Sequence, residues 1–136
     1  TIWAFATLGV RPGGELLGGM ERRAVATMQG FNHQAIANTI WAYATLGVTP
    51  GKELLGGVER RAVDTMQGFN PQEVANTIWA FATLGVRPGG ELLGGMERRA
   101  VATMQGFNHQ AIANTIWAYA TLGVTPGKEL LGGVER

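Results

Sequence analysis

Apolar residues recur at helical spacing in two kinds of segment that alternate along the chain. With residues placed about 100° apart, the first kind has one apolar arc made of Ile36, Ala37, Ile40, Trp41 and Ala44. The second kind has a matching arc made of Leu55, Val58, Ala62 and Met66. A single pair of such helices is too small to bury its apolar faces, so the pattern predicts helix pairs that stack on their neighbours.

The first kind of segment, which we call helix A, carries clear start and stop signals. Asn70 is a favourable N-cap residue, Pro71 suits the first helical position, and Glu73 completes a capping-box pattern. Gly85 is placed to end the helix. These signals predict helix A over residues 71–84, and the same pattern places it at 33–46 and 109–122, with a remnant at 1–8.

The second kind of segment, helix B, follows a turn that contains proline and is expected to close at the glycine of a Gln-Gly pair. We predict it over residues 13–29, 51–67 and 89–105. Its weak point is Gly56–Gly57, because a glycine inside a helix costs about 1 kcal/mol relative to alanine. Either these glycines let a neighbouring helix approach closely, which we favour, or they split helix B in two.

The helix pair recurs every 38 residues, a period marked by Trp3, Trp41, Trp79 and Trp117. Residues 1–60 are identical to residues 77–136, so two types of repeat alternate. The repeats predict an all-α fold, a right-handed α-solenoid. We treat 1–136 as one segment of a longer array, divided into a partial repeat 1–31, repeats 32–69 and 70–107, and a partial repeat 108–136.

The composition limits the classes of function that the chain can have. The chain has 11 Lys and Arg against 10 Asp and Glu, so its net charge of +1 neither requires nor excludes a nucleic acid. It lacks cysteine, no apolar run approaches the roughly 18 residues of a membrane span, and no nucleophile stands beside a base. His33 and His109, at helix starts, have no further ligand at metal spacing, so we expect surface residues there. We therefore expect that the chain is not an enzyme, binds no cofactor or metal ion, and does not associate with a membrane.

The segment from Asn70 to Gly85, followed by Pro, Glu-Leu-Leu and Arg-Arg-Ala at set distances, resembles the octotricopeptide repeat family. The 38-residue period agrees, and the resemblance covers the whole chain. It implies an α-solenoid that binds single-stranded RNA in chloroplasts or mitochondria and acts in transcript stability, processing or translation.

A polar stripe opposite the apolar arc of helix A is the candidate RNA surface, on the concave side of the array. Asn amides offer both donors and an acceptor for base edges or phosphates, although amides at a fixed repeat spacing also suit a structural ladder. Position 35/73/111 alternates between Ala and Glu, so we expect it to discriminate bases and the target to repeat every two nucleotides. The candidate RNA-binding residues are Ala35, Asn38, Thr39, Glu73, Asn76, Thr77, Ala111, Asn114 and Thr115.

Two further sets of residues favour structural roles over RNA contact. The tryptophans lie on the apolar arc, so we expect core packing in preference to base stacking. The recurring Arg-Arg pairs follow a glutamate, which favours ion pairing or solvation over phosphate contact. The competing hypothesis for the whole chain is a structural or protein-binding array, one whose open ends stack on other copies into filaments.

Overall fold

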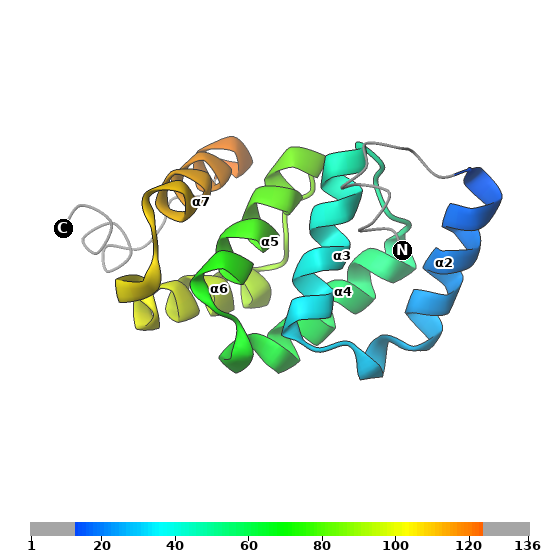
Figure 1. The fold of residues 1–136 in the computed structure, drawn as a ribbon, viewed down its shortest axis with the longest axis horizontal. Helices are drawn as coiled ribbons and strands as arrows, with labels where there is room; N and C mark the ends of the chain where they lie inside the picture. Colours follow the sequence, from blue (N-terminus) through cyan, green and yellow to red (C-terminus); the bar gives the residue numbers. More distant parts are fainter. Residues whose placement is uncertain (1–12, 124–136) are drawn as a thin grey trace.

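The computed structural model describes residues 13–123, and its regular secondary structure there is all helical (Figure 1). Three helices correspond to helix A: α3 (His33–Leu46), α5 (Pro71–Leu84) and α7 (His109–Leu122). Three correspond to helix B: α2 (Gly14–Ala26), α4 (Lys52–Thr65) and α6 (Gly90–Ala102). A short 3-10 helix follows each helix B, at Met28–Gly30, Met66–Gly68 and Met104–Gly106.

The predicted limits of helix A are confirmed for all three described copies, because the sequence signals act as expected. Asn70 accepts a hydrogen bond from the backbone N–H of Glu73, and the Glu73 carboxylate accepts one from the backbone N–H of Asn70. Gly85 ends the helix in the left-handed region at φ 71°, where a side chain would be strained. The predicted remnant at 1–8 lies outside the described residues.

Helix B is shorter than predicted, because its last turn tightens into the 3-10 helix. The closing glycines Gly30, Gly68 and Gly106 are not left-handed: in the described residues only Gly47, Gly85 and Gly123 have positive φ. At Gly68 and Gly106, the lack of room for a side chain explains the glycine instead. A Cβ at Gly68 would lie 2.6 Å from Cδ2 of His33, and one at Gly106 would lie 3.0 Å from Cγ of Pro71. Glycine at these two positions leaves room for the first residue of helix A of the same repeat.

The glycine pair does not split helix B, since α4 runs unbroken through Gly56–Gly57. A Cβ added at Gly57 would touch the Met28 side chain at 3.5 Å, and one at Gly95 would touch Met66 at 3.7 Å. The split is therefore wrong for α4, and the neighbour lies at ordinary van der Waals distance from the position of the added Cβ. The group that packs closely on the glycine is a methionine from the 3-10 helix of the preceding repeat.

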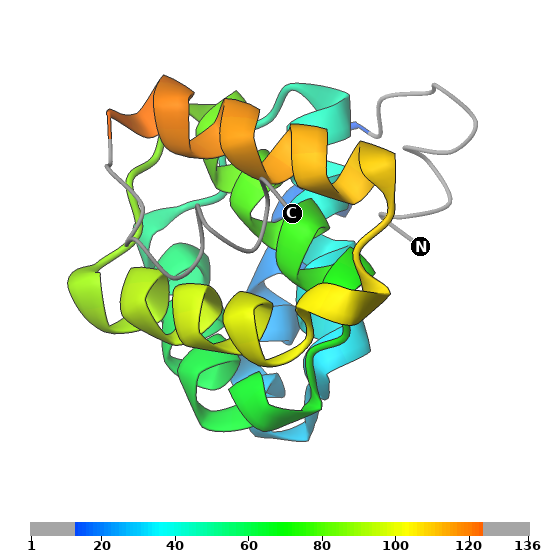
Figure 2. The same ribbon diagram turned by 90° about the vertical axis from the view of Figure 1, so that its left-hand side faces the viewer.

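The helices form two layers. Helices α3, α5 and α7 pack side by side in one layer, and α2, α4 and α6 pack in the other (Figures 1 and 2). Figure 2 shows the arrangement at one end, where α7 lies over α6. The core between the layers is built from the largest fully buried side chains, among them Tyr43, Leu54, Phe69, Phe81, Leu92 and Met96. Leu54, and not Leu55, is the leucine that helix B buries completely.

Candidate nucleic-acid interface

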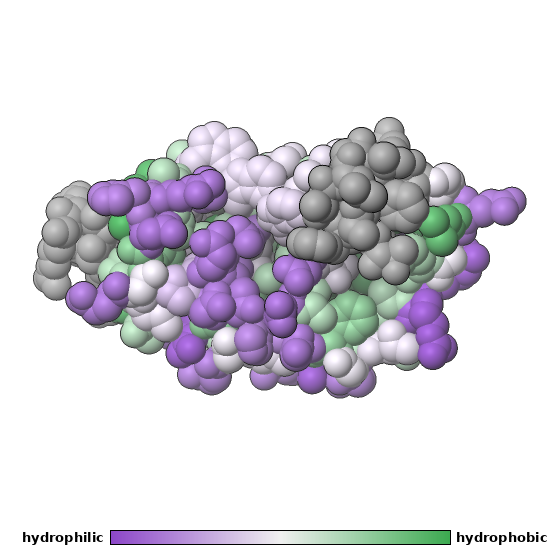
Figure 3. All heavy atoms as spheres, in the orientation of Figure 1, coloured by the Kyte–Doolittle hydropathy of each residue, from purple (hydrophilic) through white to green (hydrophobic). Residues whose placement is uncertain are grey.

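Each helix A presents one face to solvent, and this face carries the same four residues in every described repeat. In α5, Gln72 and Thr83 are exposed, while Asn76 and Trp79 are half-buried. Spacings of four, three and four residues keep these positions on one side of a helix. Hydrophilic residues gather over α5 and α3 in the view of Figure 3. We call the following set the helix-A stripe: Gln34, Asn38, Trp41, Thr45, Gln72, Asn76, Trp79, Thr83, Gln110, Asn114, Trp117 and Thr121.

The two flanks of helix A are covered by the neighbouring copies. Ala75 and Ile78 of α5 are 0 % exposed, whereas Ile116, the equivalent of Ile78 in α7, is 44 % exposed. The difference arises because α7 covers α5, while no described helix A follows α7. The opposite flank of α7 faces α5 and is buried at Ala111 and Thr115.

The burial of these flanks corrects the prediction of the RNA-contact surface. Thr77, Ala111 and Thr115 are 0, 1 and 2 % exposed, so they lie between helices where RNA does not reach them. Thr115 Oγ1 donates to the Ala111 carbonyl over 2.8 Å, a bond that satisfies a buried hydroxyl. Ala35 and Thr39 occupy the same flank of α3 and are half-buried. Of the nine predicted residues, only the asparagines at 38, 76 and 114 belong to the helix-A stripe.

The tryptophans lie where the core meets the solvent face of helix A. Trp41 and Trp79 are half-buried and pack against the core, as expected in part, yet they lie three residues after the stripe asparagines on the solvent face. Trp117 is 47 % exposed. The sequence contained this signal, because Asn38 and Trp41 are three residues apart. The expectation that tryptophan packs in the core placed it opposite the asparagine, whereas the two share one face.

Asn76 shows which of the two amide hypotheses fits the geometry. Its Oδ1 accepts a hydrogen bond from Nε2 of Gln72 over 3.0 Å, one turn earlier in the same helix. This contact runs along the helix and not from repeat to repeat, as a ladder would require. This bond uses neither the amide N–H groups of Asn76 nor the side-chain carbonyl of Gln72.

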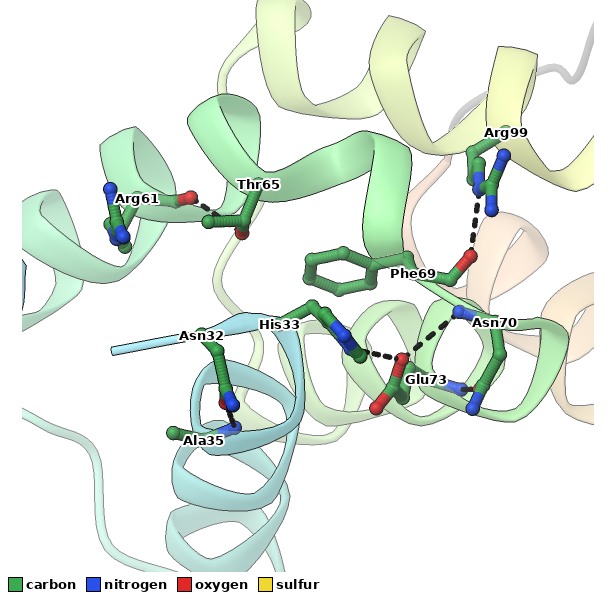
Figure 4. Close-up of polar contacts among 9 residues, drawn as sticks. All are labelled: Asn32, His33, Ala35, Arg61, Thr65, Phe69, Asn70, Glu73 and Arg99. Atoms are coloured by element: carbon green, nitrogen blue, oxygen red, sulfur yellow. Dashed lines mark hydrogen bonds and ion pairs between the residues drawn. The ribbon is translucent and has the colours of Figure 1, made fainter. Parts of the chain in front are cut away.

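Glu73, the predicted base-discriminating residue, has a structural role. Besides the capping box, its Oε1 lies 2.7 Å from Nδ1 of His33 in the preceding repeat (Figure 4). The Glu73 side chain is only 12 % exposed. His33 also lies against the Phe69 ring, with ring centroids 6.2 Å apart. His33 is therefore an interface residue, so the expectation of a simple surface residue is wrong for His33, while His109 is exposed as expected.

The Glu-Arg-Arg segment of helix B joins each repeat to its two neighbours. Glu59 accepts a hydrogen bond from the backbone N–H of Gly89, the N-cap of the next helix B, at 2.6 Å. Arg61 Nε donates to the Phe31 carbonyl of the preceding repeat at 2.7 Å. Arg99 donates to Phe69 at the same distance (Figure 4). Arg61 and Arg99, the second arginines of their pairs, thus bond to the backbone, which neither the ion-pair nor the phosphate hypothesis anticipated.

The first arginine of each pair, Arg22, Arg60 or Arg98, remains exposed. Arg60 lines a groove on the helix-B layer together with Glu59 and Glu91, so acidic groups offset its charge. The helix-A stripe, by contrast, carries no ionisable residue. An RNA on the stripe would be held by stacking and hydrogen bonds more than by charge.

Tyr43 shows a further difference between the two repeat types. Its hydroxyl donates to Oε1 of Glu21 over 3.1 Å, whereas its counterpart Phe81 has no hydroxyl to donate. Burial and the Glu21 carboxylate raise the pKa of Tyr43 well above its ordinary value. Burial and Glu97 raise the pKa of Tyr119, the equivalent residue in α7, to about 12. Both phenols therefore stay neutral at physiological pH.

The described part of the chain offers no metal cluster and no membrane span. Residues 13–123 hold no cluster of three His, Asp or Glu side chains suited to a metal ion. Over the same range, every helix is too short or too polar to cross a bilayer.

Comparison with known proteins adds the family to this geometry. No curated protein matches the chain. The family model described as RNA-editing substrate-binding complex 6 protein matches residues 1–126, which is most of the sequence. A repeated, uncharged stripe of aromatic and amide side chains on an all-helical fold agrees with an RNA-related family. The chain belongs to the RNA-editing substrate-binding complex 6 protein family.

Proposed function

We propose that this protein binds single-stranded RNA along the helix-A stripe. The observation that carries the proposal is the recurrence of one solvent-facing Gln, Asn, Trp and Thr set in each described helix A. Unpaired bases stack on aromatic side chains and bond to amides through their edges, which are the groups that the stripe offers. Membership in a family named for the binding of RNA-editing substrates supports RNA as the ligand.

The arrangement of the helices supports this mode of binding. Because α3, α5 and α7 lie side by side, their stripes form adjacent rows, one for each repeat. Neighbouring packed helices are roughly 8–10 Å apart, a spacing that a single strand can follow with one nucleotide for each repeat. We propose that the two layers continue as a right-handed α-solenoid of the octotricopeptide kind, with the stripe on its concave side.

The biological role follows from the same ligand. We infer a non-enzymatic part in organelle transcript processing, in which the protein holds an RNA for other components of an editing complex. Of the two organelles, the mitochondrion is the one we propose, in keeping with an RNA-editing family.

The test is binding of an unstructured fluorescent RNA, followed by anisotropy at two salt concentrations. We expect Asn76→Ala to weaken binding several-fold while the free energy of unfolding changes by less than about 0.5 kcal/mol. Gln67→Ala, an exposed amide on the 3-10 helix after α4, is the matched control and should bind normally. Because the stripe is uncharged, affinity should fall only weakly with salt. A steep salt dependence, with Asn76→Ala binding like the unmodified chain, would reject the stripe as the site.

A second function is favoured by one observation, the open flank of α7. Ala113, Ile116, Trp117 and Ala120 are exposed there, although their equivalents in α5 are half-buried or buried. We propose as the alternative that another copy or a partner protein covers this flank. Sedimentation velocity across a concentration series tests it. Self-association that Ile116→Lys abolishes and Thr121→Lys leaves intact would favour this function, and a monomer at all concentrations would count against it.

A further inference from the structure

The alternation between the two repeat types does not reach the helix-A stripe. Five of the eight alternating pairs pack inside the protein, at core positions or between repeats: His33/Pro71, Ala35/Glu73, Ile36/Val74, Tyr43/Phe81 and Val58/Met96. The other three are exposed away from the stripe, in the turn before helix B, at its first residue or in its last turn: Thr49/Arg87, Lys52/Gly90 and Asp64/Ala102. An RNA on the stripe therefore meets the same groups in each described repeat.

The alternating residues are matched to one another. Where repeat 32–69 meets repeat 70–107, His33 faces Glu73 at 2.7 Å. Where repeat 70–107 meets repeat 108–136, the equivalent pair is Pro71 and Ala111, and neither side chain is ionisable. In the core, Ile36 and Val58 of one repeat correspond to the smaller Val74 and the larger Met96 of the next, and all four are buried. Packing thus accounts for the buried part of the alternation, and the exposed part lies away from the stripe, so a two-nucleotide code is not needed.

We propose that the helix-A stripe takes a run of a single base, and that this base is adenine. The proposal rests on the RNA-binding function above and specifies its substrate class. The single-base part follows from the identity of the stripe. The choice of adenine follows from the chemistry of the amide pair and the tryptophan.

The bond between Gln72 and Asn76 leaves a donor on Asn76 and an acceptor on Gln72 unused. With Oδ1 of Asn76 engaged by Gln72, the Asn76 amide N–H groups are available as donors and the Gln72 carbonyl as an acceptor. Adenine presents an exocyclic amine beside a ring nitrogen, and amide side chains recurrently bind these two groups together. Trp79, one turn further along, exposes part of its ring, and a purine offers it a larger stacking area than a pyrimidine.

Because the stripe lacks cations, the phosphate backbone contributes little that is common to all sequences. Base stacking and edge contacts must then dominate the affinity. Differences between homopolymers should be large for this reason, and they should persist at high salt.

The experiment compares twelve-nucleotide oligo(A), oligo(U), oligo(C) and alternating (AC) RNA by fluorescence anisotropy at 50 and 200 mM salt. We expect oligo(A) to bind about tenfold more tightly than oligo(U) or oligo(C), with alternating (AC) between them. An oligomer of purine riboside, which keeps the ring and lacks the exocyclic amine, should lose at least about fivefold. Asn76→Ala should abolish the difference between these two purine oligomers, while Gln67→Ala should preserve it.

Other outcomes overturn the inference in distinguishable ways. Equal binding of all homopolymers would show that the stripe does not select a base. Tightest binding of alternating (AC) would restore a two-nucleotide code, and tightest binding of oligo(U) or oligo(C) would reject adenine. Failure of every RNA to bind would instead reject the proposed RNA-binding function itself.

Discussion

The solvent face of helix A and the contacts between repeats differ in what they vary. The helix-A stripe keeps Gln, Asn, Trp and Thr in each described copy, whereas the interfaces alternate between His33 with Glu73 and Pro71 with Ala111. The stripe is thus constant, while alternation occurs at contacts such as that between His33 and Glu73 and at a few exposed positions of helix B and the turn before it. The comparison shows that a sequence period of two repeats can come from packing partners as well as from a ligand.

Trp79 belongs to both regions, so its replacement should have the largest effect. Trp79→Ala removes a half-buried ring that packs on the core, and we expect the free energy of unfolding to fall by about 3 kcal/mol. Urea unfolding measures the loss, with Thr83→Ala on the same stripe as the control. RNA affinity of the folded fraction should fall as well. A variant as stable as the unmodified chain would show that Trp79 contributes to the ligand surface alone.

The two arginines of one pair sharpen the contrast between interface and surface. Arg99→Ala removes the bond from Nε to the Phe69 carbonyl, and we expect a cost of about 1–3 kcal/mol. Arg98→Ala, at an exposed neighbour, should change stability by less than about 0.5 kcal/mol. Thermal unfolding of the two variants side by side is the measurement. Equal losses from both would mean that the contact between repeats adds nothing to stability.

Tyr43 tests a smaller difference between the repeat types. Tyr43→Phe removes the hydroxyl that donates to Glu21, and Phe81 shows that phenylalanine fits this position, so we expect a cost of about 1 kcal/mol.

The pH dependence of the same variant follows from the raised pKa of Tyr43. The folded state holds the phenol proton more tightly than the unfolded chain, so this stability is complete below the unfolded pKa of about 10 and is lost as pH rises above it. Tyr119, with its pKa raised to about 12, behaves alike. The melting temperature, measured from pH 8 to 11.5, should therefore fall less steeply with pH for the double variant Tyr43→Phe/Tyr119→Phe than for the unmodified chain. Parallel curves for the variant and the unmodified chain would contradict the burial of these hydroxyls.

Local signals were sufficient to predict helix A, because its cap, its first-turn proline and its closing glycine are all local. Helix B was predicted too long, since the closing glycine was expected to end an α-helix and the last turn is a 3-10 helix in all three described copies. The candidate site was predicted in part. Asn76 was identified from its chemistry, but the burial of Thr77 and the pairing of Glu73 depend on which flank the next repeat covers. No property of a single helix contains that information.

The most direct test of the central claim converts one repeat type into the other where they meet. Pro71→His/Glu73→Ala gives repeat 70–107 the same helix-A start as repeat 32–69, and it removes both the capping box and the partner of His33. We predict that the free energy of unfolding falls by about 1 kcal/mol, while the ratio of affinities for oligo(A) and alternating (AC) RNA stays the same. Unchanged stability together with a changed affinity ratio would contradict the account, because position 73 would then act on the ligand and not on the neighbouring repeat.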